Sequence, residues 1–227
     1  MIDTNLLKSI PIFNNFPFEE LSEIAKITEL ESYDKDAIVF RENTTGDNLY
    51  FILSGIVRIY KTAQDGKTKT LAYLEKGDFF GEMTAFVSGK RSASARAMEP
   101  CKVAVINNKD LLTLISKNPR IARHFLDTMT MRLREADKQI QALTFQNVQS
   151  RLTVLLFDLA DRHGKQTDTG ILIDFPITHQ ELANMVGTAR EVVSRILTNW
   201  KFQGLIDTDK HNIVLKDKAK LAEIMKA

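Results

Sequence analysis

The most restrictive feature of this 227-residue sequence is a pair of short amphipathic segments joined by a glycine near the C-terminus. Thr178 and Glu181 have the spacing of a capping box, in which the threonine hydroxyl accepts from the backbone three residues on and the glutamate reaches back. Gly187 supplies the positive φ that ends a helix. The inward face of this first helix is formed by Leu182, Ala183, Met185 and Val186. The pattern predicts a helix-turn-helix over about 178 to 203.

The second helix of this pair is expected to start at Thr188, as its cap, and to run to about Phe202, with Val192, Val193, Ile196, Leu197 and Trp200 inward. Charged and polar residues near its start are expected to point outward: Arg190, Glu191, Ser194 and Arg195. Arginine suits guanine and glutamate suits the cytosine amino group, so these residues predict a DNA-reading helix. A hairpin over Asp207–Asn212 is expected to form a wing. The alternative is an ordinary pair of helices with solvated charges.

Composition limits the partners and the compartment. The net charge is +2, and the segment from Gln146 onward carries 11 Lys/Arg against 10 Asp/Glu, so attraction to phosphates depends on local arrangement and on doubling in a dimer. The single cysteine, Cys101, allows no internal disulfide and cannot hold an iron–sulfur cluster alone. No apolar run approaches the ~20 residues of a membrane helix, and no signal peptide begins the chain. We expect a reduced, cytoplasmic protein.

A long helix is predicted from Asn118 to about Phe145, because apolar residues recur at intervals of four and three: Ala122, Leu126, Met129, Leu133, Ala136, Ile140 and Leu143. A stripe this narrow over three heptads favours pairing with a second copy of the helix. The alternative is a helix that lies on its own domain. Another helix is expected over Val148–Arg162, then a polar loop, His163–Gly170, and a strand, Ile171–Phe175, with a hinge near Asn147.

The first half of the chain has a different hydrophobic pattern. Residues 1 to 30 predict short helices, and from Tyr33 to about Asn107 short apolar stretches alternate with glycines about ten residues apart. This spacing is typical of an antiparallel sandwich or barrel. The predicted fold is therefore α+β: a β-barrel sensor domain over 1–117, a dimerisation helix and hinge over 118–146, and a winged helix-turn-helix over 147–227.

A second unusual stretch lies inside the predicted barrel, where Gly81-Glu82-Met83 is followed by Arg91-Ser92-Ala93. A glycine-opened turn lets backbone N–H groups approach an anion, and Arg91 and Ser92 add a guanidinium and a hydroxyl. Glu82 suits a ribose hydroxyl better than a phosphate. No nucleophile–base pair or metal-spaced histidines accompany them, so we expect no enzyme.

Nearly the whole chain resembles the family of the cyclic-AMP receptor protein and FNR, in which a cyclic-nucleotide-binding jelly roll controls a DNA-binding domain. The stretch Gly81-Glu82 … Arg91-Ser92-Ala93 is similar to the family's phosphate-binding cassette, Arg132-Leu133 … Leu143-Thr144-Phe145 to its dimerisation helix, and 187–197 to its recognition helix. The resemblance implies a homodimer and a palindromic operator resembling TGTGA…TCACA. It also implies that Glu82 holds the ribose 2′-hydroxyl and that Arg91 and Ser92 hold the phosphate.

Carried over residue by residue, the resemblance implies two further sets of contacts. Ligand contacts come from the cassette and the long helix: Gly81, Glu82, Met83, Arg91, Ser92, Ala93, Arg132, Ala136 and Asp137. DNA contacts come from the helix-turn-helix: Thr178, His179, Gln180, Thr188, Ala189, Arg190, Glu191, Ser194 and Arg195. The resemblance also implies that the polar loop His163–Gly170 contacts RNA polymerase, as the corresponding loop does in the family.

Several positions depart from the family pattern. Ala136-Asp137 replaces a Thr-Ser pair that contacts adenine, and our hypothesis is that Asp137 helps to choose the base of a cyclic nucleotide, cyclic AMP or a relative; the alternative is a solvated or ion-paired carboxylate. His179, Ala189 and Val192 stand where the family uses an arginine or a hydroxyl on phosphate, which predicts weaker affinity.

Other sensors of this family do not fit the residues. A single cysteine excludes the FNR cluster, and no histidine lies in the predicted barrel to bind haem; the four are His124, His163, His179 and His211. We therefore expect no metal, haem or iron–sulfur cofactor. Cys101 is interpreted as a core residue, with a thiol switch as the alternative. The predicted mechanism is a ligand that shifts or extends the long helix through 145–147, so that two recognition helices meet major grooves ~34 Å apart. The alternative is a ligand-independent regulator with a vestigial pocket.

Overall fold

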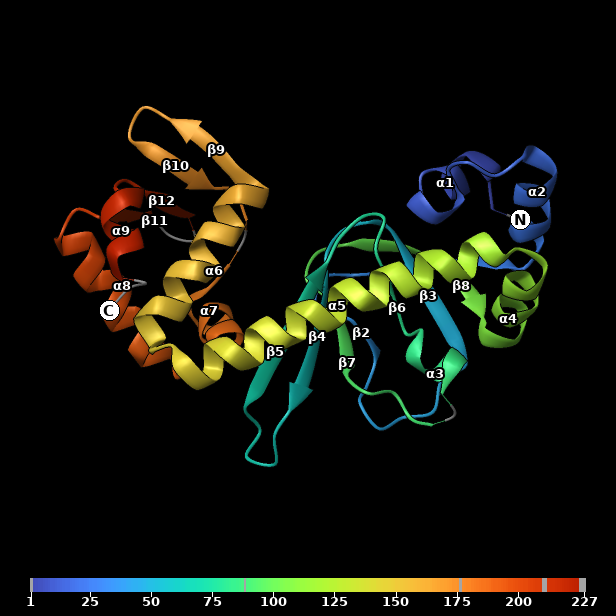
Figure 1. Cartoon of the computed structure of the whole chain (residues 1–227), viewed down its shortest axis with the longest axis horizontal. Helices are drawn as coiled ribbons and strands as arrows, with labels where there is room; N and C mark the ends of the chain where they lie inside the picture. Colours follow the sequence, from blue (N-terminus) through green and yellow to red (C-terminus); the bar gives the residue numbers. More distant parts are fainter. Residues whose placement is uncertain (1, 88, 176, 210–211, 225–227) are drawn as a thin grey trace. The chain divides into compact units, whose positions relative to one another are not determined.

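The computed structural model describes residues 2–87, 89–175, 177–209 and 212–224 (Figure 1). The chain forms two compact units, 1–131 and 132–227, and each is described by itself. Within the described ranges no helix is long and apolar enough to cross a membrane.

The first unit contains short helices, two sheets and the start of a long helix. Its helices are α1 (Thr4–Lys8), a 3-10 turn η1 (Pro11–Phe13), α2 (Phe18–Lys26), α3 (Met83–Phe86), α4 (Asn108–Lys117) and α5 (Pro119–Phe145), the last of which continues into the second unit. Its strands are β1 (Thr28–Tyr33), β2 (Ile38–Phe40), β3 (Asn48–Ser54), β4 (Val57–Thr62), β5 (Thr68–Leu74), β6 (Phe79–Phe80), β7 (Ser94–Ala97) and β8 (Cys101–Asn107). Strands β2, β3, β4, β5 and β8 lie at the short apolar stretches noted between Tyr33 and Asn107, and β1, β6 and β7 are additional.

The strands form two four-stranded sheets and not one closed barrel, so the predicted barrel is only an approximation. The orders are β1-β8-β3-β6 and β2-β7-β4-β5. At Gly55 the backbone has a φ of +89° and carries the chain from β3 in the first sheet to β4 in the second. A Cβ there would lie 2.7 Å from the carbonyl oxygen of Pro100, so glycine is required. The turn at Gly66 closes the β4–β5 hairpin.

Two apolar cores hold this unit together. The core between the sheets takes inward residues from both, and its buried members are Tyr50, Ile52, Val57, Leu74, Phe80, Ala95, Ala97, Cys101, Val103 and Val105. The other core lies between the outer face of the first sheet and the helices, and includes Phe13, Leu21, Phe51, Ile106 and Phe125. Cys101 is 1% exposed and its Sγ lies 3.3 Å from the carbonyl oxygen of Ile56, which agrees with a core residue.

The long helix α5 has two different faces. Ile121 and Phe125 are buried against the first unit, so the N-terminal end of the helix does pack on its own domain. Four residues of the predicted stripe lie on another face: Leu126, Leu133, Ile140 and Leu143 are 67, 64, 63 and 46% exposed. A fifth, Met129, packs against the core of the first unit, as the alternative predicted. An exposed stripe is the arrangement expected if a second helix covers it.

The second unit is a helical domain with a small sheet. Its helices after α5 are α6 (Val148–His163), α7 (His179–Val186), α8 (Arg190–Phe202) and α9 (Lys218–Ile224), and its strands are β9 (Gly164–Thr167), β10 (Gly170–Ile173), β11 (Ile206–Asp209) and β12 (Asn212–Leu215), in the order β11-β12-β10-β9. The loop predicted over His163–Gly170 was wrong in part, because residues 164–167 pair with β10 as β9. Strand β10 ends at Ile173, short of the predicted Phe175.

The β11–β12 hairpin forms the predicted wing, with Ile206 paired to Leu215 and Asp209 to Asn212. The two residues of its turn, Lys210 and His211, lie outside the described residues, as does Pro176.

Candidate nucleotide cassette and DNA-reading surface

The cassette begins between β6 and α3 at a backbone position that only glycine adopts without strain. Gly81 has a φ of +85°, and a Cβ there would lie 2.9 Å from the carbonyl oxygen of Asn48. Glycine is needed to turn the chain into α3 in so small a space. The next residue, Glu82, is the N-cap residue of α3 and is only 6% exposed. A buried carboxylate therefore stands at the start of the cassette.

Arg91 joins the cassette to the first sheet. It is 3% exposed; its Nη1 donates to the carbonyl oxygen of Gly81 (2.8 Å) and to the hydroxyl of Thr84 (3.2 Å), and its Nη2 donates to the carbonyl oxygen of Asn48 (2.9 Å). The guanidinium also lies over the ring of Phe40, 4.3 Å from its centroid, where a cation is attracted to the π-face. These contacts bring Gly81 and Arg91, ten residues apart, into direct contact.

The guanidinium of Arg91 is not fully satisfied by the chain. Its Nε is buried and lacks a hydrogen-bond acceptor among the described residues. Burial lowers the pKa of Arg91, and the nearby Tyr50, Asp47 and Glu82 oppose that shift. A buried N–H without an acceptor costs free energy comparable to a lost hydrogen bond, so an anion that supplied the acceptor would stabilise the site.

The other predicted ligand residues fall into two groups. Ser92 is exposed, its hydroxyl lies 3.0 Å from the sulfur of Met83, and Ala93 is buried beside it. Arg132, Ala136 and Asp137 belong to the part of α5 in the second unit, where Arg132 is half-buried and the other two are exposed. The structure thus brings the cassette residues together, and contact between the cassette and these three remains a prediction.

The cassette helix α3 touches the first turns of α5 through aromatic rings. Phe86 of α3 meets Phe125 edge-on at 5.4 Å between centroids, and Phe79 of β6 meets the same ring at 4.6 Å. His124 lies near Phe79, 6.4 Å between centroids, as a half-buried packing residue. The cassette helix and β6 therefore pack directly against the N-terminal turns of α5.

The helix-turn-helix has the predicted cap and turn. The amide of Glu181 donates to the hydroxyl of Thr178 (3.2 Å), the carboxylate of Glu181 accepts from the amide of Thr178 (2.7 Å), and Gly187 has a φ of 72°. The start of α8 differs from prediction: its N-cap is Ala189, which offers no side-chain acceptor, and not Thr188. The reason is that the amide of Thr188 still bonds back to Ala183, so the turn is one residue longer than expected.

The outward face of α8 carries exposed charges. Arg190, Glu191 and Arg195 are exposed, and in the described ranges none of their side chains has a hydrogen bond or an ion pair. The inner residues Val193, Ile196, Leu197 and Trp200 are buried, which fixes this face outward. Ala189, Gln180 and Thr178 are exposed at the same end of the helix pair, and Thr188 is half-buried.

His179 links the two helices. Its Nδ1 lies 2.8 Å from the hydroxyl of Ser194 on α8. Burial, and to a smaller degree the positive charge of Arg190, lowers the pKa of His179 below its ordinary value. The side chain at this position is therefore held by α8.

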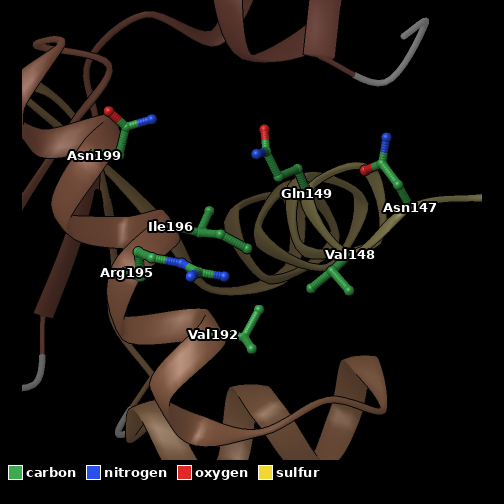
Figure 2. A pocket seen from close by; sticks show the side chains of 7 residues that line it. All are labelled: Asn147, Val148, Gln149, Val192, Arg195, Ile196 and Asn199. Carbon is green, nitrogen blue, oxygen red and sulfur yellow. The ribbon is translucent and has the colours of Figure 1, made fainter.

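A pocket of about 690 Å³ opens between α8 and the first turn of α6. In Figure 2, Val192 and Ile196 project from α8 toward α6, and Arg195 extends across the same space. Asn147, Val148 and Gln149 form the opposite wall, at the N-terminal end of α6. This wall places Asn147, Val148 and Gln149 beside Arg195, next to the predicted DNA-reading residues. Asn147, the N-cap residue of α6, was predicted only as a hinge.

Comparison with known proteins assigns both halves of the chain. Residues 30–118 match the cyclic nucleotide-binding domain, and residues 150–224 match the Crp-like helix-turn-helix domain. The chain is 32% identical to the cyclic AMP receptor protein of Thermus thermophilus, over 96% of this chain and 98% of that protein.

Two solved structures are similar over almost the whole chain. A CooA mutant from Carboxydothermus hydrogenoformans is 27% identical, with a TM-score of 0.80 and coverage of 99% of this chain and 97% of that one. The c-di-GMP responsive global regulator CLP of Xanthomonas campestris is 26% identical, with a TM-score of 0.80 and coverage of 88% and 99%.

The fold and the two sites define a transcription regulator that combines a cyclic-nucleotide-binding domain with a DNA-binding helix-turn-helix. The chain belongs to the Crp/Fnr family.

Proposed function

We propose that the protein is a homodimeric regulator whose N-terminal domain binds a cyclic nucleotide and thereby raises its affinity for a palindromic operator. The observation that supports this most is the buried Nε of Arg91, an N–H without an acceptor among the residues that the structure describes, beside the buried carboxylate of Glu82. A cyclic phosphate supplies acceptors for the guanidinium and for Ser92, and a ribose hydroxyl donates to Glu82. The residues present therefore fit a nucleotide, which is an effector and not a reactant.

The base of the nucleotide is chosen, in our proposal, with the help of Asp137. Its carboxylate is exposed on α5 and accepts either from the amino group of adenine or from N1 and N2 of guanine. Relatives differ in their signals: one is a cyclic AMP receptor and another is responsive to c-di-GMP. We favour cyclic AMP, because the relative named for it covers nearly the whole chain.

The exposed stripe of α5 supports the homodimer, and the exposed charges of α8 support sequence reading. In a dimer two copies of Arg190, Glu191 and Arg195 face successive major grooves about 34 Å apart. Doubling the interface compensates for the nearly balanced charge of the domain. We further propose that the surface around β9 and β10 contacts RNA polymerase, and that the protein is not an enzyme.

A second function is favoured by a specific observation. Both Nη atoms of Arg91 already bond to acceptors of the chain itself, Gly81, Thr84 and Asn48, which suits a vestigial pocket and a ligand-independent regulator. Measuring whether the wild-type protein binds a nucleotide distinguishes the nucleotide-controlled regulator from the ligand-independent one.

Isothermal titration of cyclic AMP and cyclic GMP into the wild type and into Asp137→Ala tests the proposal. We expect one nucleotide to bind the wild type, and Asp137→Ala to reduce the preference between the two. Absence of binding by either nucleotide, with none found by mass spectrometry in the protein as purified, would favour the ligand-independent regulator.

A further inference from the structure

The junction of α5 and α6 lies at Gln146 and Asn147, where helical hydrogen bonding is interrupted. In a continuous helix the carbonyl of Gln146 would accept from the amide of Ser150, four residues on. Instead, that amide donates to the side-chain Oδ1 of Asn147 (2.9 Å), and that carbonyl accepts from Nη1 of Arg151 (2.6 Å). Two side chains therefore satisfy the two halves of one missing helical bond, which stabilises the break.

Arg151 also reaches the helix-turn-helix. Its Nε donates to the carbonyl oxygen of Val186 (2.9 Å), the last residue of α7, directly before the turn glycine Gly187. The carbonyls at a helix C-terminus lack internal partners and carry partial negative charge. A planar guanidinium presents several donors in a fixed geometry, so one arginine can satisfy the ends of two helices at once.

The adjacent Ser150 holds a third helix end. It is 3% exposed, and its hydroxyl donates to the carbonyl oxygen of Ile224 (3.1 Å) near the end of α9. The first turn of α6 thus contacts the C-terminal ends of α5, α7 and α9. The contacts of Arg151 with Val186 and of Ser150 with Ile224 join residues far apart in the sequence. They connect the junction to the rest of the helix-turn-helix domain.

We infer that Arg151 is a positioning residue that holds the α5–α6 junction and the turn at Gly187 as one group. If α5 extended through the junction, the carbonyl of Gln146 would turn along the helix axis to accept from the amide of Ser150, and would turn away from Nη1 of Arg151. The bond to Val186 would then lose its fixed geometry, and the start of α8 would be free to change its direction. A change at the junction is in this way passed to the recognition helix, which is a coupling between two discrete arrangements. Only the consequence for DNA binding depends on the proposed function.

Hydrogen exchange of the full chain, without nucleotide or DNA, tests the coupling. The amides that report are those of Ser150 at the junction, which donates to Oδ1 of Asn147, and of Thr188 at the turn, which donates to Ala183. Arg151→Gln is expected to speed exchange at both sites by about tenfold, the effect of one lost charge-assisted hydrogen bond. The matched control is Arg162→Gln, since Arg162 lies on the same helix and pairs only with Asp158 within the part of the chain described.

A double-mutant cycle shows whether the effect passes through Arg151. Asn147→Ala frees the Ser150 amide to compete for the Gln146 carbonyl. It is therefore expected to speed Thr188 exchange severalfold in the wild type and to have no further effect in Arg151→Gln. An equal effect of Asn147→Ala in both backgrounds overturns the inference, as does unchanged Thr188 exchange in Arg151→Gln.

If Arg151→Gln does not fold, Arg151→Lys replaces it, because a lysine ammonium cannot span both carbonyls. We then expect faster exchange at one of the two sites. Unchanged exchange at both sites contradicts the positioning role of Arg151. Operator affinity measured with and without cyclic AMP forms the second arm: the increase on adding cyclic AMP should be smaller in Arg151→Lys than in the wild type. If cyclic AMP has no effect on the wild type, the proposed function fails while the exchange data still decide the role of Arg151.

Discussion

The exposed stripe of α5 makes the strongest quantitative prediction, at Leu133. This side chain is 64% exposed, and burying a whole leucine side chain contributes about 1.5–3 kcal/mol. Covering the exposed part therefore contributes about 1–2 kcal/mol for each copy, and about 2–4 kcal/mol for the pair in a dimer. Leu133→Glu forfeits this contribution and brings two carboxylates together, so the dimer dissociation constant should rise by about 30- to 1000-fold.

Sedimentation velocity over a concentration series measures this change. The matched control is Met131→Glu: Met131 is 71% exposed on the same helix but lies outside the stripe. We expect Met131→Glu to remain dimeric where Leu133→Glu is monomeric. Equal dissociation of the two variants, or an unchanged sedimentation of Leu133→Glu, would refute the assignment of the stripe as the dimer interface.

Three further predictions concern the DNA-binding domain. Arg195→Ala should relax specificity at one base pair by ~1–3 kcal/mol, seen as a smaller affinity difference between operator variants in fluorescence anisotropy. Gly187→Ala should lower the free energy of unfolding by ~1–2 kcal/mol in urea, because its φ of 72° is unfavourable for alanine. The pKa of His179 is lower in the folded than in the unfolded protein. The contribution of neutral His179 to the free energy of unfolding is therefore complete above about pH 6.5. The free energy of unfolding falls as the pH drops from the unfolded pKa through the folded pKa. His179→Asn should lose that part of the pH dependence, and identical slopes for both proteins would contradict the shift.

Where hydrophobic periodicity was strong, the elements followed from the sequence. The α5 helix runs over Pro119–Phe145 against a predicted 118–145, because three heptads define a helix independently of its surroundings. Strand β1 was missed: in TELESY the one aliphatic residue, Leu30, is 53% exposed, and the segment is extended because it pairs with β8. Such a strand is specified by its neighbour and not by its own pattern.

In the sites, too, features set by local sequence could be predicted, and features that depend on distant contacts could not. The capping box and Gly187 are local, so residue types and spacing were sufficient to predict them. The partners of Arg91 include the carbonyl of Asn48, 43 residues away, and a contact of that range depends on strand pairing. The role of Arg151 was also missed, because an arginine in the first turn of a helix resembles a solvated charge until the ends of α5 and α7 are placed beside it.

The central claim is that a nucleotide in the N-terminal domain controls operator binding. The most direct measurement is the affinity of the full chain for a duplex carrying TGTGA…TCACA, at fixed salt, with and without saturating cyclic AMP, for the wild type and for Arg91→Gln. We predict that cyclic AMP tightens binding by the wild type by at least about tenfold, a coupling of ~1.4 kcal/mol, and that Arg91→Gln loses this increase. Wild-type binding that cyclic AMP leaves unchanged, and that Arg91→Gln reproduces in full, would contradict the account.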